Sequence, residues 1–280
     1  MRIVIDQAAP DVLLLTDFDY DLDGAALGAF ADLFDGDYPY RFAAQPNSGV
    51  QTDLDLDQNG RTGEPRDALG YGRFAGDGGL AILSRYPIGE VDDLSDMLWR
   101  DLPGATMPAG YYADEVIDIL RLSSTAHWIV PIDGPDGRFH LLAFGATPPV
   151  FDGPEDRNGL RNRDELRMWE WVLDGGNGTV PSHFLIAGNA NLDAAAGNGM
   201  NDAMAAFLSD PRLQDPLVDQ PNADWSDRGP GKLRVSYVLP AATWDVVDAG
   251  TFWPTPEDRS FSGDHLPAGP HHLVWVDIVR

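Results

Sequence analysis

The stretch Leu185-Ile-Ala-Gly-Asn-Ala-Asn-Leu-Asp193 combines a short apolar run with a polar loop. Residues 184–187 have the length of a buried strand, and the glycine that follows interrupts the run. We therefore expect Asn189, Asn191 and Asp193 just beyond the strand end, where sandwich and α/β enzymes often place their chemistry. An Asn/Gly turn that only reverses the chain would give the same pattern, and this stretch alone favours that simpler interpretation.

The charge of the 280-residue chain limits its partners. It carries 19 basic and 45 acidic residues, a formal net charge of -26, which repels nucleic-acid phosphates and argues against nucleic acid as a partner. The local basic cluster of Arg157, Arg161 and Arg163 is equally compatible with a solvated helix start. Solubility alone explains the acidity as well as a cation-binding role does.

The chain contains no cysteine, so disulfides and thiolate chemistry are excluded. No apolar run is long enough to span a bilayer, and residues 1–10 lack the apolar segment of a secretory signal. We therefore expect no membrane partner, and an exported location would require a truncated N-terminus. The sequence indicates neither the compartment nor the oligomeric state.

Apolar runs and amphipathic segments alternate without a convincing domain boundary, which predicts a single α/β domain over residues 1–280. The turn Asp133-Gly-Pro-Asp-Gly137 predicts a hairpin between the strands on either side of it. The expected strands lie at residues 11–16, 79–84, 127–132, 139–144, 184–187, 233–239, 244–252 and 273–279, and the expected helices at residues 24–34, 166–173 and 201–208.

Two acidic segments are candidates for binding cations. The first, Asp17-Phe-Asp19-Tyr-Asp21, follows an apolar strand, and in an extended segment its three carboxylates would share one face. One of them is a candidate metal ligand, while the others more often cap the following helix.

The second acidic segment is Asp53-Leu-Asp-Leu-Asp-Gln-Asn-Gly60. Asp55, Asp57 and Asn59 stand at alternate positions before a turn-forming glycine, as at the opening of a calcium loop. The closing Glu of an EF-hand is missing, because Arg66 stands there and an aspartate follows. A structural calcium site and a solvated acidic loop are equally compatible with this pattern.

Seven stretches between residue 10 and the C-terminus together resemble the endonuclease/exonuclease/phosphatase superfamily. They are Pro10-Asp-Val-Leu-Leu-Leu-Thr-Asp17, Gly79-Leu-Ala-Ile-Leu-Ser-Arg85, His127-Trp128 before Val130-Pro131, Thr147-Pro-Pro-Val-Phe-Asp-Gly-Pro-Glu-Asp-Arg-Asn158, Gly188-Asn-Ala-Asn191, Arg234-Val-Ser-Tyr-Val-Leu-Pro240 and His271-His-Leu-Val-Trp-Val-Asp277. The stretch over residues 147–158 is the most specific, and it is too elaborate for a plain connector, so we expect it to line a pocket. On its own, His127 would more often be a hydrogen-bonded structural histidine than a catalytic one.

The resemblance implies a four-layer α/β/β/α sandwich of two mixed β-sheets that hydrolyses phosphoesters with a divalent cation, Mg²⁺ or Mn²⁺. Such a cation neutralises charge that develops on the phosphoryl oxygens. By position, Asp17 corresponds to the acidic metal ligand, Asn191 to the phosphate-orienting asparagine and His271 to the C-terminal histidine. The other residues implied to act in catalysis or substrate binding are Asn189, His127, Asp156, Arg157 and Asn158.

Four positions depart from the pattern of the superfamily. Asn189 replaces the aspartate that would take the proton of the attacking water, and an amide cannot act as that base. Gly145 replaces a histidine and Ser236 replaces an aspartate. Pro270 precedes His271 where relatives have Ser-Asp. Activity is therefore doubtful.

The sequence Ser262-Gly-Asp264-His265 is an alternative to the segment at His271, but the last strand does not follow it directly, so it ranks lower. The chain also starts almost at the second strand of the superfamily, which predicts either a truncated N-terminus or a sheet without its first strand. The expected function is a metal-dependent phosphoesterase-like protein with impaired catalysis, acting on a small phosphoester. The alternative is a non-catalytic pseudoenzyme that binds a ligand or calcium.

Overall fold

The strands and helices alternate along the chain, as the computed structural model shows for residues 2–178, 180–227, 229–253 and 269–280. The helices are α1 (Arg2–Ala8), α2 (Ala25–Ala31), α3 (Asp114–Ile117), α4 (Arg157–Leu173) and α5 (Asn201–Leu208), and short 3-10 helices span Asp32–Phe34, Pro65–Asp67 and Trp99–Asp101. The strands are β1 (Val12–Phe18), β2 (Tyr40–Phe42), β3 (Gly79–Ser84), β4 (Asp92–Asp93), β5 (Ala126–Gly134), β6 (Gly137–Gly145), β7 (Phe184–Asn189), β8 (Ala223–Trp225), β9 (Gly231–Leu233), β10 (Ser236–Pro240), β11 (Asp245–Phe252) and β12 (Leu273–Val279).

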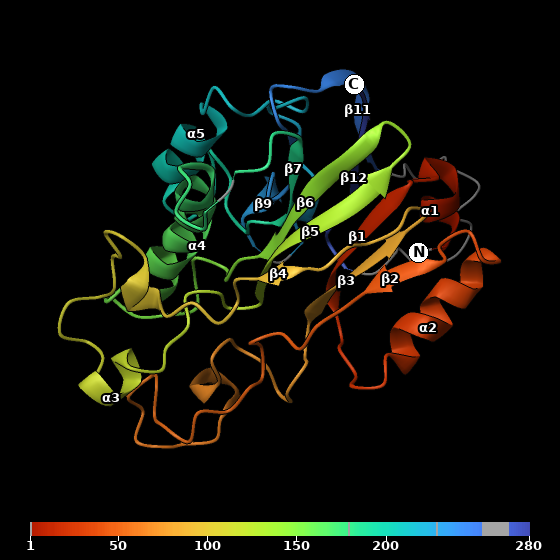
Figure 1. Cartoon of the computed structure of the whole chain (residues 1–280). Coiled ribbons are helices and arrows are strands. Elements are labelled where there is room, and N and C mark those ends of the chain that lie inside the picture. Colours follow the sequence, from red (N-terminus) through yellow and green to blue (C-terminus); the bar gives the residue numbers. More distant parts are fainter. Residues whose placement is uncertain (1, 179, 228, 254–268) are drawn as a thin grey trace.

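Two main sheets organise these strands (Figure 1). The larger sheet has the order β10-β7-β6-β5-β4, in which β6 and β7 are parallel and the other neighbours antiparallel. The smaller sheet, β1-β3-β2, is antiparallel, while β11 pairs with β12 and β8 with β9 in separate ladders. This combination of mixed sheets and helices confirms the expected α/β class.

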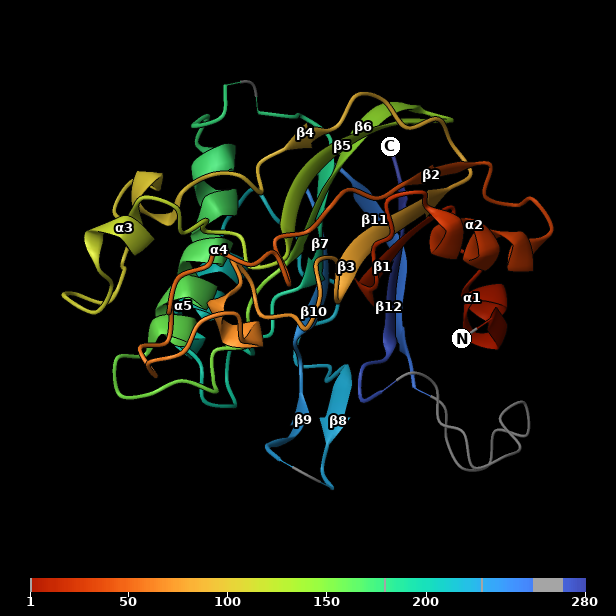
Figure 2. The same cartoon turned by 90° about the horizontal axis from the view of Figure 1, so that it is seen from below.

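Helices lie outside the sheets, with α4 and α5 on the side of the larger sheet and α1 and α2 on the side of β1 (Figure 2). Trp169 of α4 is completely buried in the same apolar core as Leu142 and Ile186 of the larger sheet. A second core joins Leu27 of α2 to Leu13 of β1. Among the described residues, no helix is long and apolar enough to cross a bilayer.

Local sequence signals explain several of these elements. The strands β5 and β6 form the expected hairpin, and Gly137 begins β6 with a φ of 108°, which a side chain would disfavour. The carboxylate of Asp21 accepts hydrogen bonds from the N–H groups of Ala25 and Ala26 at 2.8 and 2.9 Å. Asp21 therefore caps α2, as its place in the acidic segment suggested.

The single strand expected at residues 233–239 is divided into β9 and β10. Between them, the N–H of Arg234 donates to Asp193 Oδ2 at 2.7 Å. The N–H groups of Val235 and Ser236 donate to Asn222 Oδ1 at 3.0 and 3.1 Å. These three N–H groups thus donate to side chains rather than to a neighbouring strand, which the alternating sequence could not reveal.

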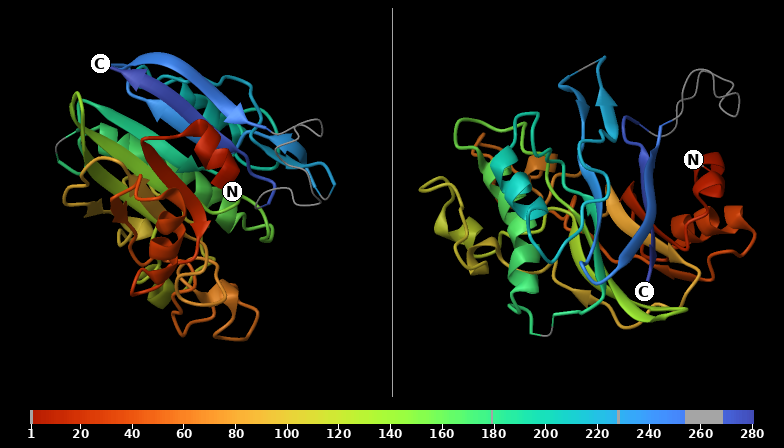
Figure 3. Two further views of the ribbon diagram at one scale, coloured as in Figure 1. Left: turned by 90° about the vertical axis from the view of Figure 1, so that its right-hand side faces the viewer. Right: turned by 90° about the horizontal axis from the view of Figure 1, so that it is seen from above.

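Residues of β1 and β12 line one cavity of about 1110 Å³. Figure 3 shows the N-terminal part of the chain (red) and its C-terminal part (blue) from two further sides. β1 pairs with β3 and β12 pairs with β11, and the part of the chain that the structure describes places no strand on the other edge of either. Polar residues from several strand ends meet at one end of this cavity.

Candidate active site at the strand ends

Three of the positions that depart from the superfamily pattern form one row across the larger sheet. Asn189 at the end of β7 is the register partner of Gly145 on β6 and of Ser236 on β10. Neighbouring strands lie about 4.8 Å apart, so these three positions are side by side. We call them the strand-end row, and all three line the cavity.

Asp17 lines the same cavity from β1. It stands at an irregularity between Thr16 and Phe18, where the register with β3 shifts, and its φ of 57° is left-handed. A Cβ atom at Gly78 would lie 2.7 Å from Asp17 Oδ1, so the glycine leaves room for this carboxylate. Asp17 is exposed, so its carboxylate is open to a cation from solvent.

Asn191 is held in a left-handed conformation with a φ of 52°. Its N–H donates to Asn189 Oδ1 at 3.1 Å, and its side-chain Nδ2 donates to the carbonyl of Ala146 at 2.8 Å. The side chain of Asn189 therefore shapes the turn, and the Asn191 amide ties the ends of β6 and β7 together. A fixed Asn191 amide can orient a bound anion or offer its carbonyl oxygen to a cation.

His271 stands at the entrance to β12 and also lines the cavity. Its ring meets Trp225 edge-on at 5.2 Å. Burial lowers the pKa of His271, and the negative charge of Asp17 opposes this only in part. The imidazole is therefore neutral at pH 7 and can donate or accept a hydrogen bond.

Arg73 and Asn222 complete the region, and the sequence analysis identified neither. Arg73 comes from a glycine-rich loop and adds a positive charge to the cavity lining. Asn222 is almost fully buried, and its backbone carbonyl accepts a hydrogen bond from the N–H of His272 at 2.8 Å. Because Asn222 Nδ2 also donates to the carbonyl of Ser236 at 2.6 Å, it joins the starts of β10 and β12. No local sequence pattern predicts such a long-range role.

His127, expected among the substrate-binding residues, lies outside the residues that line the cavity. It is completely buried, with Nδ1 at 2.8 Å from Ser123 Oγ and Nε2 at 3.1 Å from the carbonyl of Glu165. Its ring lies near those of Phe144 and Trp169. Burial lowers the pKa of His127 to about 3, so it is a neutral packing residue.

Asp156, Arg157 and Asn158 form the start of α4 and are likewise not brought to the cavity. Arg157 is buried and donates to the carbonyl of Leu56 at 3.1 Å, while Asn158 Nδ2 donates to the carbonyl of Val150 at 2.7 Å. Of the specific stretch over residues 147–158, only the first two residues line the cavity. The expectation that the whole stretch lines a pocket therefore holds for its start alone.

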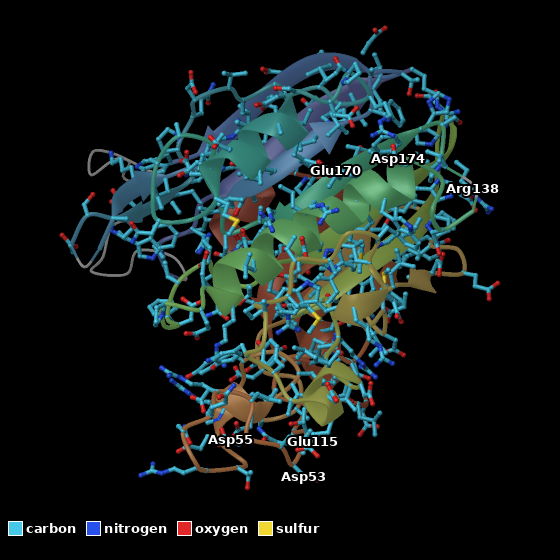
Figure 4. All side chains as sticks on the ribbon, turned by 90° about the vertical axis from the view of Figure 1, so that its left-hand side faces the viewer. Asp53, Asp55, Glu115, Arg138, Glu170 and Asp174 are labelled. Carbon is cyan, nitrogen blue, oxygen red and sulfur yellow. The ribbon has the colours of Figure 1, made fainter. Side chains whose placement is uncertain are left out.

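The second acidic segment forms a separate cluster, and Figure 4 labels Asp55 at the margin of the molecule. Carboxylate oxygens of Asp55, Asp57 and Asp67 all lie within 4.8 Å of one another. Asn59, expected as a ligand, instead donates from Nδ2 to Glu64 Oε2 at 2.6 Å. Asp67 of the 3-10 helix Pro65–Asp67 takes its place, and its Oδ1 accepts a hydrogen bond from the N–H of Leu56 at 3.0 Å, a contact that sequence spacing alone could not show.

A mixed sheet, a smaller antiparallel sheet and helices outside them, with polar residues gathered where strands end, are typical of a phosphoesterase-like or nuclease-like fold. The profile of the Endonuclease/Exonuclease/phosphatase family matches residues 2–265, and the chain belongs to this family. The alternative segment over residues 262–265 lies outside the described residues.

Solved structures show the same fold. An endonuclease/exonuclease/phosphatase from Beutenbergia cavernae is 19% identical with a TM-score of 0.61, covering 99% of this chain and 64% of that chain. A family protein from Leptotrichia buccalis is 15% identical, with a TM-score of 0.57 and coverage of 99% and 90%. The 3'-5' exonuclease from Neisseria meningitidis is 13% identical, with a TM-score of 0.54 and coverage of 99% and 92%. The chain thus spans 64% of the Beutenbergia protein. None of the proteins with a curated description matches this sequence.

Proposed function

We propose that this chain is a divalent-metal-dependent phosphoesterase-type protein whose hydrolytic step is impaired. The observation that carries the proposal is the strand-end row, where Gly145, Asn189 and Ser236 stand side by side. None of these side chains can take a proton from water or hold a positive charge near neutral pH. The row therefore offers a surface for binding but no general base.

The residues around the row support binding of a cation and a phosphoester. Asp17 supplies a carboxylate and Asn191 an amide oxygen, which are the hard oxygen ligands that Mg²⁺ and Mn²⁺ prefer. When bound, the cation would supply charge neutralisation at the phosphoryl oxygens. Arg73 and the neutral His271 would then contact the anion directly. The net charge of -26 favours a small phosphoester over nucleic acid as the ligand.

The size of the impairment follows from the missing proton transfer. General acid or base catalysis contributes roughly 10²- to 10⁴-fold in rate. Losses at residues that act as a unit do not multiply, so the three replacements together cost about as much as the most serious one. A side chain at position 145 requires a small movement of Thr125, because a Cβ atom there would lie 3.3 Å from Thr125 Cβ, which is closer than ordinary van der Waals contact.

The test is hydrolysis of an activated phosphomonoester and phosphodiester with magnesium, manganese and calcium in turn. A variant carrying Gly145→His, Asn189→Asp and Ser236→Asp should exceed the unmodified chain by about 10²-fold or more, and Asp17→Ala in that variant should abolish the gain. Alanine at the same three positions is the matched control. If the unmodified chain turns over rapidly and Asp17→Ala stops it, the site is active and the impairment is refuted.

The cluster of Asp55, Asp57 and Asp67 favours a second, non-catalytic role as a structural calcium site. Ca²⁺ takes several carboxylate and carbonyl oxygens in flexible geometry, and three convergent carboxylates fit that preference. The same metal series, read by thermal unfolding, tests this role. Calcium should raise the melting temperature of the unmodified chain but not of Asp55→Asn, and equal behaviour of the two would rule the site out.

A further inference from the structure

We propose that Tyr71 selects phosphoesters whose alcohol part carries a planar aromatic ring, by stacking on that ring while Arg73 faces the phosphoryl group. Both residues line the cavity that Asp17 also lines. The inference rests on the proposed function, because it names the class of phosphoester that the same cavity takes.

The loop over residues 70–73 has two different faces. A Cβ atom at Gly70 would lie 1.7 Å from a backbone carbonyl oxygen of a neighbouring loop, and one at Gly72 would lie 2.5 Å from a backbone nitrogen. Neither position therefore admits a side chain, and the backbone lies directly against its neighbours on that face. Tyr71 and Arg73 alternate with these glycines, and their side of the loop borders the cavity instead.

Hydrogen bonds hold both ends of this loop in place. The N–H of Gly70 donates to the carbonyl of Asn47 at 3.1 Å, and the carbonyl of Gly70 accepts from a backbone N–H of the same neighbouring segment at 2.9 Å. Further along, the N–H of Gly76 donates to the carbonyl of Ser48 at 3.1 Å. The backbone that carries Tyr71 is therefore fixed before a ligand arrives, which lowers the entropic cost of binding.

The fold leaves the Tyr71 side chain without a partner. It is 63% exposed although it lines the cavity, and within the described ranges its ring meets no other aromatic ring and no cation. Aromatic rings attract one another in offset-stacked or edge-to-face arrangements beyond the gain from buried area. A large ring on a fixed backbone therefore offers a ready face to the ring of a ligand.

Arg73 supplies the charge that distinguishes a phosphoester from a neutral aromatic compound. The chain has 45 acidic residues against 19 basic ones, yet the Arg73 guanidinium forms no ion pair with any carboxylate that the structure describes. A guanidinium that the fold does not use is free to donate two hydrogen bonds to phosphoryl oxygens.

The far end of the same loop reaches the proposed cation ligand. Gly78 leaves room for the carboxylate of Asp17, and the N–H of Gly78 donates to Asp19 Oδ1 at 3.0 Å. A phosphoester bound to the cation through its phosphoryl oxygens can thus extend its alcohol part along the loop to Tyr71. The cavity of about 1110 Å³ has space for a large alcohol part, since sites for small molecules usually measure about 300–1,000 Å³.

The test compares phenylphosphonate with cyclohexylphosphonate. Both carry the same anionic group and a six-carbon ring, but only the first ring is planar and aromatic. The P–C bond of each compound resists hydrolysis, so binding is measured without turnover. Calorimetric titration of the 280-residue chain in saturating Mg²⁺ should give a Kd about three- to tenfold lower for phenylphosphonate.

Variants of the loop locate the preference. Tyr71→Ala should bring the two Kd values within about twofold of each other, whereas Tyr71→Phe keeps the ring and should preserve the difference. Phe74→Ala is the matched control, because Phe74 is an exposed ring of the same loop but does not line the cavity. It should leave both Kd values unchanged.

The outcomes separate this inference from the proposed function. Equal binding of the two compounds by the unmodified chain, or a preference that survives Tyr71→Ala, would overturn the inference and leave the phosphoester site intact. If neither compound binds in Mg²⁺, the proposed function fails and the inference fails with it. Where the preference is found, adenosine monophosphate distinguishes two sources of the ring: tighter binding than phenylphosphonate identifies a nucleotide, and weaker binding an aryl ester.

Discussion

The strand-end row and a polar network beneath α4 lie in the same sheet region but differ in their surroundings. The row opens onto the cavity, and the Asn189 side chain in it accepts a hydrogen bond from the N–H of Asn191. The α4 network consists of five residues that bond to one another and to buried backbone groups. They are Ser123, Ser124, His127, Arg161 and Glu165.

Glu165 shows how fully this network is connected. Its Oε1 accepts from the N–H and the Oγ of Ser124 at 2.6 Å each, and its Oε2 accepts from the N–H of Thr147 at 2.7 Å. Burial nevertheless raises the pKa of Glu165 to about 7. Breaking such contacts leaves unsatisfied buried groups and costs stability, whereas the side chains of the strand-end row border an open cavity, where a substitution leaves fewer buried groups without partners. The comparison teaches that the α4 network supports the fold, while three of the departures from the superfamily pattern lie at the cavity.

The largest expected effect concerns His127 and pH. Its pKa is about 6.5 in the unfolded chain and about 3 when folded, so its contribution is present above pH 6.5 and is lost as pH falls toward 3. The corresponding loss is about 5 kcal/mol. Urea unfolding between pH 7 and 3 should show a flatter dependence in His127→Gln than in the unmodified chain. Parallel curves for the two proteins would contradict the structural role of the neutral His127.

The next effect concerns Arg161, which donates to the carbonyls of Leu69, Arg121 and Leu122 at 2.6, 2.7 and 2.9 Å. Arg161→Ala leaves these acceptors without partners and should lower the unfolding free energy by about 4 kcal/mol. Denaturant titration measures this loss of unfolding free energy. Arg138→Ala, which removes an exposed ion pair, should cost less than about 1 kcal/mol. Similar losses for both arginines would show that the network is not what holds the loops together.

The smallest effect compares two serines. Ser124 Oγ donates to the buried carboxylate of Glu165, so Ser124→Ala should cost about 2 kcal/mol. Ser236 is half-buried in the strand-end row, and Ser236→Ala should change stability by less than about 0.5 kcal/mol. Thermal unfolding of the two variants under the same conditions measures both losses of stability. A large loss of stability in Ser236→Ala would mean that the strand-end row also stabilises the fold.

Much of the fold could be predicted from the sequence because its signals are local. The hairpin around Gly137 and the helix Asn201–Leu208 follow from turn chemistry and apolar spacing. The interruption between β9 and β10 could not be predicted, because it depends on Asn222 and Asp193, which are distant in the sequence.

The candidate site was predictable only in part. Asp17, Asn191 and His271 come from three separate elements and do line one cavity, as the resemblance implied. His127 and Arg157 were expected to bind substrate because they belong to specific stretches, yet both are buried in structural contacts. Sequence specificity does not distinguish a residue fixed by packing from one fixed by a ligand, since both constrain the side chain.

Asn222 has a consequence for how the molecule moves. Its side chain holds Ser236 of β10, and its carbonyl holds His272 just before β12. A displacement of the β11–β12 hairpin is therefore transmitted to Ser236 of the strand-end row through Asn222. The position of β12 and the position of Ser236 are thus coupled. Thermodynamic reciprocity requires that a ligand which favours one position of Ser236 also shifts the preferred position of β12, by the same free energy.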